Sequence, residues 1–209
     1  MQSIEGCFHM VRTLAIAAVV AVLGGIGAGY YFSMSQTDVA SCSSSTVAGD
    51  IGGPFELVNQ HGETVTDAEV ITEPTLVYFG YTFCPDVCPF DVSRNADAID
   101  LLLERGVSAT PVFITIDPDR DTVDILSDYA GNMHERMIGL TGTPEQIAAA
   151  SKAYKTYYKA HKDGTDEYLV DHSTFTYLMM PETGFAEFFR RDTTAEQMAD
   201  TVACFAAGA

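Results

Sequence analysis

Residues 75–89 of this 209-residue chain read TLVYFGYTFCPDVCP. The stretch begins with β-branched and aromatic residues and reaches Gly80, a pattern typical of a buried strand that ends in a turn. Cys84 and Cys88 follow, four positions apart, so a helix that begins at the first cysteine would present both sulfur atoms on one face. Such a pair can share one metal ion or form a disulfide.

A thiol pair at a strand-to-helix junction is the thioredoxin arrangement. There the positive end of the helix dipole lowers the thiol pKa, and a thiolate is both a nucleophile and a ligand for soft metals. A structural zinc site usually takes four ligands, and this chain has no second cysteine pair. Chance seldom places two ordinary buried cysteines directly after a strand. The pattern therefore predicts a redox-active pair or a soft-metal site of low coordination number.

Among the five histidines, His172 is the candidate for a third ligand. It precedes a strong strand pattern, and in a thioredoxin-like sheet the loop before that strand faces the cysteines. Thioredoxins carry a cis-proline in this loop, whereas this chain has no proline between Tyr154 and Met180. Two thiolates and an imidazole would select Cu(I) and also accommodate Cu(II). No ligand spacing joins His172 to the cysteines, so an ordinary loop or core histidine is the alternative.

Four sequence blocks follow one another along the chain: FGYTFCPDVCP (79–89), FITIDPDRDT (113–122), GLTG (139–142) and DHST (171–174). In this order they resemble the signature of the SCO/SenC copper-chaperone family, and the resemblance extends from about Ile51 to the C-terminal helix. It implies a thioredoxin-like fold in which Cys84, Cys88 and His172 bind copper. It also implies delivery of copper, or of reducing equivalents, to the binuclear copper centre of cytochrome c oxidase subunit II.

Two functional classes follow from the resemblance. A metallochaperone would receive copper from a donor protein, hold it with Cys84, Cys88 and His172, and pass it on by ligand exchange. A thiol–disulfide oxidoreductase would instead reduce the copper-ligand cysteines of subunit II. Cys84, which is nearer the helix start, would then be the attacking thiolate, and a thioredoxin-like reductant would restore the pair. A copper or redox sensor is a weaker third class.

Other polar residues near the motifs have simpler interpretations. Asp86 favours the positive end of a helix dipole and is interpreted as a helix start. Asp171 is expected to point away from His172, because adjacent residues of an extended segment face opposite sides. His161 lies in a polar insert, residues 159–167, predicted to be a mobile loop, and is an auxiliary copper contact at most. The acidic run 117–121 lacks an EF-hand pattern and is interpreted as architecture or as part of a docking surface.

Beyond residue 54 the hydrophobic pattern predicts one α/β domain, residues 54–209, with thioredoxin-like element order. Residues 143–158 are predicted to form a helix, and Thr193 with Glu196 is expected to cap the last one. The predicted strands are 55–58, 64–65, 75–81, 112–116, 137–140, 175–180 and 186–190, and the other helices are 88–105, 122–130 and a last one that ends near 205.

The N-terminal segments predict a membrane anchor. Residues 14–32 contain only apolar, glycine and tyrosine residues, and with Val11 and Thr13 they reach the length that crossing a bilayer requires. The predicted anchor therefore spans residues 11–32, with residues 1–10 in the cytoplasm and residues 33–53 as a flexible linker. Arg12 places the N-terminus inside, so the domain faces the periplasm from the inner membrane; the mitochondrial intermembrane space is the less favoured equivalent.

The cysteines outside the pair have separate interpretations. Cys42 ends a lipobox-like VASC, so lipidation at Cys42 is an alternative anchor. Cys204 is interpreted as a small buried hydrophobe.

The chain is strongly acidic, with a formal net charge of −18. Nucleic acid is excluded as a partner because its phosphates would be repelled. A basic patch on a target, or a basic copper donor, would be attracted.

Overall fold

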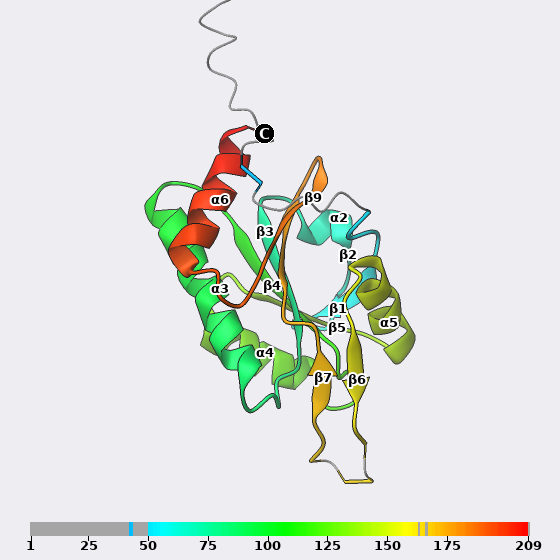
Figure 1. Ribbon diagram of the computed structural model, residues 1–209. Helices are drawn as coiled ribbons and strands as arrows, with labels where there is room; N and C mark the ends of the chain where they lie inside the picture. Colours follow the sequence, from blue (N-terminus) through cyan, green and yellow to red (C-terminus); the bar gives the residue numbers. More distant parts are fainter. Residues whose placement is uncertain (1–41, 44–49, 163, 166, 209) are drawn as a thin grey trace, which may run out of the picture. The chain divides into compact units, whose positions relative to one another are not determined.

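The computed structural model describes residues 42–43, 50–162, 164–165 and 167–208 (Figure 1). Those up to Ala207 belong to the unit Val39–Ala207. At its centre lies a seven-stranded sheet with the order β2-β1-β5-β4-β3-β8-β9. The strands are β1 (Glu56–Asn59), β2 (Thr64–Thr66), β3 (Thr75–Gly80), β4 (Thr110–Thr115), β5 (Ile138–Thr141), β8 (Thr176–Met180) and β9 (Gly184–Phe189).

The middle of the sheet is parallel and buried. β3 pairs with β4, and β4 with β5, in parallel, whereas β8 joins β3 and β1 joins β5 in antiparallel orientation. Every residue of β3 and of β4 is buried. Strands that are covered on both faces read as continuous apolar runs, which explains the pattern of residues 75–80. The predicted thioredoxin-like architecture, a mixed sheet flanked by helices, is confirmed.

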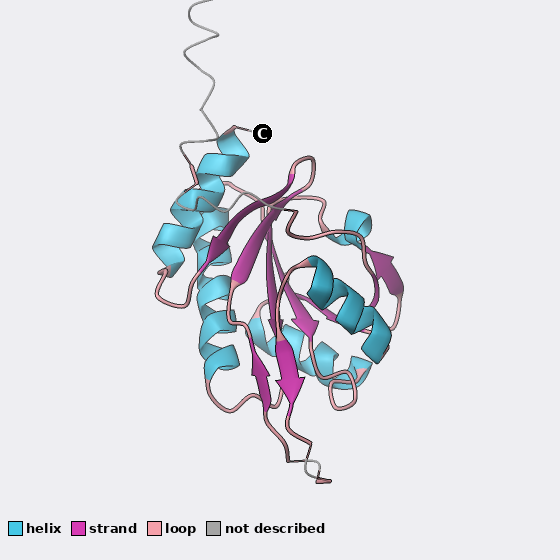
Figure 2. Ribbon diagram, turned by 45° about the vertical axis from the view of Figure 1, so that its right-hand side comes forward, coloured by secondary structure: helices cyan, strands magenta, loops and turns pink. Residues whose placement is uncertain are grey.

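Helices cover both faces of the sheet (Figures 1 and 2). On one side lie α3 (Val87–Glu104), α4 (Val123–Met133) and α6 (Ala195–Ala207), and on the other α2 (Asp67–Val70) and α5 (Pro144–Ala153). α3 and α4 connect successive parallel strands in the same direction along the sheet. Right-handed crossovers therefore put both on one face, where α3 packs against α4 and α6.

Two predictions about helix ends were wrong. The helix expected over residues 143–158 ends at Ala153, because Tyr154 is the C-cap and Lys155 takes a left-handed conformation with φ 54°. The ring of Tyr154 then packs on Phe79 with centroids 5.2 Å apart. At the last helix, the reciprocal cap is made by Thr194 and Gln197, one position beyond the predicted pair of Thr193 and Glu196.

The polar insert predicted as a loop begins as a strand. β6 (Tyr158–Ala160) pairs in antiparallel orientation with β7 (Val170–His172), and together they form a second, two-stranded sheet. Tyr158 is the partner of His172 in this register. The ribbon therefore fixes the backbone of His172 more firmly than the predicted loop would.

The N-terminal predictions concern residues that lie largely outside the described part of the chain. The predicted anchor, residues 11–32, and the segment 1–10 are not among them, so both stay predictions. In the part of the chain that the structure describes, no helix combines the length and the apolar character that crossing a membrane requires.

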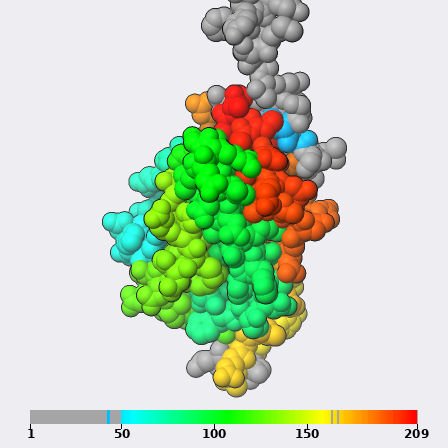
Figure 3. All heavy atoms as spheres, turned by 90° about the vertical axis from the view of Figure 1, so that its left-hand side faces the viewer, coloured from blue at the N-terminus to red at the C-terminus, as the bar shows by residue number. Residues whose placement is uncertain are grey.

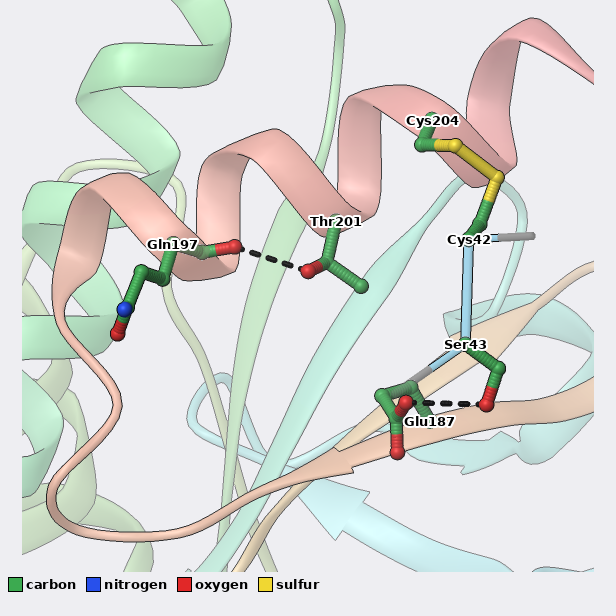
Figure 4. Close-up of a disulfide and its surroundings, with 6 residues drawn as sticks. All are labelled: Cys42, Ser43, Glu187, Gln197, Thr201 and Cys204. Atoms are coloured by element: carbon green, nitrogen blue, oxygen red, sulfur yellow. Dashed lines mark hydrogen bonds between the residues drawn. A yellow bond between two sulfur atoms is a disulfide. The ribbon is translucent and has the colours of Figure 1, made fainter. Parts of the chain in front are cut away.

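Cys42 and Cys204 form a disulfide (Figure 4). The interpretation of Cys204 as simply a small buried hydrophobe was therefore wrong, and so was lipidation of Cys42, whose sulfur is already bonded. The bond joins residues 162 positions apart, with Cα atoms 5.7 Å from each other, and ties the segment at Cys42 to α6. Beside it, the Ser43 hydroxyl donates to the Glu187 carboxylate on β9 at 3.1 Å. No sequence pattern joins two cysteines so far apart.

Asp121 connects the loops that follow the parallel strands. Its carboxylate is fully buried and accepts hydrogen bonds from the Thr82 amide (3.0 Å), the Thr82 hydroxyl (2.6 Å) and the Thr115 hydroxyl (2.5 Å). Its backbone carbonyl accepts from the Thr141 hydroxyl, at the end of β5, at 3.1 Å. One residue thus holds the ends of β4 and β5 to the turn that leads into Cys84.

Asp117 makes the corresponding link to the β6–β7 side. Its carboxylate accepts from the Tyr168 hydroxyl at 2.6 Å, two residues before β7, and pairs with Arg120 at 2.5 Å. The guanidinium of Arg120 in turn lies 3.7 Å from the centre of the Tyr168 ring. Asp117 and Asp121 of the acidic run 117–121 therefore have a structural role, which is one of the two interpretations that the sequence allowed.

Replacing both Cys42 and Cys204 with serine should lower the free energy of unfolding by about 2–4 kcal/mol, because the disulfide restrains a very long loop in the unfolded chain. Urea unfolding of the full chain in detergent measures this. Cys204→Ser alone should cost about as much, since either change breaks the same bond. An unchanged unfolding midpoint would contradict the pairing.

Asp121→Ala should lower the free energy of unfolding by about 2–4 kcal/mol, because the Thr82 amide and two hydroxyls lose a buried acceptor. Asp121→Asn should cost less, since its amide keeps one acceptor oxygen. The exposed neighbour Asp119 provides the matched control, and Asp119→Ala is expected to change stability by no more than ~0.5 kcal/mol. Equal urea midpoints for Asp121→Ala and Asp119→Ala would rule out the structural role of Asp121.

Candidate metal centre

The two cysteines lie at the carboxyl end of β3. The helix begins at Val87 rather than at Cys84, so Cys84 occupies the preceding turn and Cys88 the first turn of α3. The Cys88 amide donates to the Cys84 sulfur at 3.4 Å. Cys84 therefore accepts a hydrogen bond from an otherwise unpaired amide at the helix start, where the dipole favours negative charge. Thiolate character at Cys84 follows from this position.

Gly80 makes room for the Cys88 sulfur. A Cβ atom at this position would lie 3.1 Å from the sulfur and 2.9 Å from the rings of Tyr78 and Phe113. Any larger residue at the end of β3 would displace the thiol or the rings around it. Gly80, which ends the predicted strand, is therefore also required for the Cys88 sulfur to take its position in the site.

His172, at the end of β7, completes the group. Its Nε2 atom is 3.4 Å from the Cys88 sulfur. The other ring nitrogen, Nδ1, lies 2.8 Å from the carbonyl oxygen of Ser173, which can only accept, so Nδ1 carries the proton. The lone pair is thereby on Nε2, toward the thiols. The ligand atoms of Cys84, Cys88 and His172 all lie within 4.8 Å of one another.

Aromatic rings enclose the imidazole. Tyr78 and Tyr81 meet the His172 ring edge-on, with centroids 6.2 Å and 5.9 Å away. The Tyr81 hydroxyl accepts from the Val170 amide at 3.3 Å, which attaches β7 to the end of β3. The histidine is consequently held in place by rings from the strand that leads to the cysteines.

The pKa values of the two thiols are shifted in opposite directions. A hydrogen bond from the Cys88 thiol, together with hydrogen bonds from the amides of Asp86 and Cys88, lowers the pKa of Cys84 well below its ordinary value, despite burial. The proton that Cys88 shares with Cys84, together with burial, raises the pKa of Cys88. Cys84 is 8% exposed and Cys88 fully buried. At neutral pH the reduced pair therefore holds one negative charge, on the more accessible sulfur.

A buried polar network beneath Cys88 was not predicted. The Tyr78 hydroxyl donates to the Asp91 carboxylate at 3.0 Å, and Arg94 and Arg191 lie 3.7 Å and 3.4 Å from the other carboxylate oxygen. Asp91 and Asn95 stand three and seven positions after Cys88. Their helical spacing from Cys88 is the signal that could have indicated polar residues on the buried face of α3.

The remaining candidates lie outside the group. The Asp171 carboxylate points away from it and pairs with His161 at 2.7 Å on the exposed side of the ribbon, as expected for Asp171. Asp86 is the N-cap residue of α3 by position, yet its side chain makes no capping hydrogen bond. Among the described residues, Cys84, Cys88 and His172 form the group able to hold a metal ion. The donors suit a soft metal, and the adjacent sulfurs suit a reversible disulfide.

Comparison with known proteins identifies relatives of the whole described domain. The family model SCO1/SenC matches residues 43–207. Protein SenC of Rhodobacter capsulatus is 53% identical over 195 residues, which cover 92% of this chain and 88% of that protein. The mitochondrial SCO1 homolog 1 of Arabidopsis thaliana is 42% identical over 153 residues, covering 73% of this chain and 46% of that protein. The relatives therefore include bacterial and mitochondrial proteins.

A solved structure shares the fold. The crystal structure of Arabidopsis thaliana ScoI with copper bound superimposes with a TM-score of 0.68 at 42% identity, over 73% of this chain and 95% of that one. These matches confirm the family that the four sequence blocks indicated. The family model matches residues 43–207, and Protein SenC is 53% identical over 92% of this chain. This chain belongs to the SCO1/SenC family.

Proposed function

We propose that this protein is a copper chaperone that holds copper with Cys84, Cys88 and His172 and delivers it to the binuclear centre of cytochrome c oxidase subunit II. The observation that carries the proposal is the convergence of two sulfurs and an imidazole nitrogen within 4.8 Å, with the nitrogen lone pair already directed toward the sulfurs. Copper bound to a relative of 42% identity supports the choice of metal.

The site favours acceptance and release of copper as cargo. Two thiolates and one imidazole are donors that Cu(I) prefers, and the imidazole also suits Cu(II). Loading requires the Cys88 proton to leave, because the thiolate is the ligand. Three ligands leave space for an incoming thiolate, so cargo can pass by exchange of one ligand at a time. Cys84, the more exposed of the two cysteines, is the first thiolate ligand that such a partner can replace.

The proposed location is the periplasmic side of the inner membrane, with residues 11–32 as the anchor. A disulfide between Cys42 and Cys204 supports an oxidising compartment, since such bonds persist there and are rare in the cytosol. A copper donor protein is required on the same side.

A second function, reduction of the cysteines of subunit II, is favoured by the unequal thiols. The Cys84 thiolate would attack a target disulfide, breaking its S–S bond and releasing one target thiolate. Cys88 would then lose its proton and attack the Cys84 sulfur of the mixed disulfide, which releases the second target thiol. The products are a reduced target and a Cys84–Cys88 disulfide, which an external dithiol of the thioredoxin type would reduce.

His172→Ala should weaken Cu(I) affinity at least ~100-fold, since even the loss of an indirect metal partner costs 10–100-fold. Competition with a Cu(I) chelator measures it on the reduced full chain in detergent. His161→Ala is the matched control on the same ribbon and should leave the affinity unchanged. Disulfide exchange should survive in both variants, because it requires only the thiols. Unchanged affinity in His172→Ala would contradict the three-ligand site.

Alkylation of the reduced protein by iodoacetamide should modify Cys84 first, at a rate that changes little between pH 6 and pH 8. An ordinary thiol with a pKa near 8.5 would react roughly 80-fold faster at the higher pH. In Cys88→Ser the pH profile of Cys84 should move toward higher pH, because the Cys88 thiol is its main stabilising neighbour. Mass spectrometry of quenched samples gives both rates. An ordinary thiol profile in the wild type would refute the thiolate assignment.

A further inference from the structure

Tyr81 is a buried residue between the end of β3 and the turn that carries Cys84. Its carbonyl oxygen accepts from the Cys84 amide at 3.2 Å, so the two residues close the same turn. Its ring meets the imidazole of His172 edge-on, with centroids 5.9 Å apart. The side chain therefore lies within the metal centre, although it is not one of the three ligands.

The hydroxyl end of Tyr81 reaches the β6–β7 ribbon. Figure 1 shows this ribbon at the carboxyl end of β3, and in Figure 3 the atoms of the ribbon adjoin those of the start of α3. The amide of Val170, the first residue of β7, donates to the Tyr81 hydroxyl oxygen at 3.3 Å. An amide N–H can only donate, so this contact uses a lone pair of the oxygen and leaves the O–H proton free to be donated.

The Cys84 sulfur is the acceptor that this proton can reach. Within the part of the chain that the structure describes, no oxygen or nitrogen atom accepts from the Tyr81 hydroxyl. The sulfur lies within 4.8 Å of the His172 nitrogen, against whose ring Tyr81 packs. Burial, and a hydrogen bond to the Cys84 sulfur, raise the pKa of Tyr81. Contacts with the turn, the imidazole and the ribbon thus hold the hydroxyl beside this sulfur.

Tyr78, the other tyrosine that packs on His172, has its hydroxyl engaged elsewhere. This hydroxyl interacts with the Cys88 sulfur, but its proton is directed to the Asp91 carboxylate at 3.0 Å. A carboxylate is a stronger acceptor than a protonated thiol. The two ligand sulfurs therefore differ, because Cys84 has a hydroxyl donor at its disposal whereas the donor beside Cys88 is already in use.

The Tyr81 donor gains importance once the cargo is bound. In the metal-free pair, the Cys84 sulfur also accepts from the Cys88 thiol and from the amides of Asp86 and Cys88. Loading removes the Cys88 proton and with it the hydrogen bond from that thiol. A donor stabilises a free thiolate more than a copper-bound one, because the free sulfur carries more negative charge. The Tyr81 hydroxyl therefore favours separation of this sulfur from copper.

We propose that Tyr81 is a positioning residue whose hydroxyl donates to the Cys84 sulfur and makes Cys84 the thiolate that leaves the copper first. The role in release rests on the proposed chaperone function. The hydrogen bond itself does not depend on the metal, so it can be measured on the metal-free protein.

Tyr81→Phe removes the hydroxyl and keeps the ring. The Cys84–Cys88 disulfide of the metal-free full chain in detergent is equilibrated with glutathione, two molecules of which reduce it and form glutathione disulfide. The equilibrium constant for reduction should fall at least ~10-fold, equivalent to about 30 mV, because the reduced form loses a donor to its thiolate. The hydrogen bond from Val170 is lost in both redox forms and cancels. Alkylation followed by mass spectrometry of the peptide with both cysteines gives the reduced fraction.

Tyr154→Phe is the matched control for this equilibrium. It also removes a buried hydroxyl, one that has no hydrogen-bond partner among the described residues. The constant should change less than about twofold in this variant, because the hydroxyl is not part of the thiol site. A change equally small in Tyr81→Phe would overturn the hydrogen bond to Cys84.

Release of Cu(I) to the chelator bicinchoninate separates the hydrogen bond from a merely structural role. Tyr81→Phe should release copper at least ~5-fold more slowly and bind it more tightly, because the free thiolate is stabilised less. If the hydroxyl instead serves to hold Val170, and through β7 His172, the variant should release copper faster and bind it more weakly, which would overturn the proposal. A wild type that binds no Cu(I) would refute the chaperone function and the role in release, whereas the glutathione equilibrium would still decide the hydrogen bond.

Discussion

Two buried carboxylates hold the metal centre together. Asp121 accepts hydrogen bonds from Thr82, two residues before Cys84, and Asp117 accepts one from Tyr168, four residues before His172. Both belong to the loop after β4, so one short segment is linked to the turn with the cysteines and to the ribbon with the histidine. Buried charges are tolerated only when their hydrogen bonds are satisfied, as they are here. The ligands, far apart in the chain, are positioned by a segment that contributes none of them.

This arrangement has a chemical consequence at the site. The carbonyl of Ser173 selects the imidazole tautomer, and the start of α3 stabilises charge on Cys84, so each donor is prepared before a metal arrives. The hydrogen bond that Cys88 shares with Cys84, together with burial, explains why the buried thiol keeps its proton while Cys84 ionises. A rigid group of unlike donors suits a protein that must bind a metal and later release it, since little of the structure has to rearrange at either step.

What could be predicted from the sequence was local or was marked by a motif. β3, the turn and α3 follow from an apolar run, a glycine and the spacing of Cys84 and Cys88. The other sheet strands were placed closely by the same patterns. His172 required the family resemblance, because no spacing relates it to the cysteines. The ribbon was missed because β6 and β7 are short and pair only with each other, and the Cys42–Cys204 bond depends on a contact across almost the whole chain.

The disulfide and the free thiols together constrain how the site works. Both belong to one domain, so a compartment that keeps Cys42 and Cys204 oxidised also exposes Cys84 and Cys88 to the same oxidants. The ligand atoms of Cys84 and Cys88 lie within 4.8 Å of each other, and the thiolate of Cys84 is the reactive form. The pair can therefore remain reduced only if a bound metal occupies the sulfurs or a reductant acts faster than oxidation. If the protein acts as proposed, copper delivery and thiol chemistry are consequently not independent, because whatever removes the copper also removes the protection of the thiols.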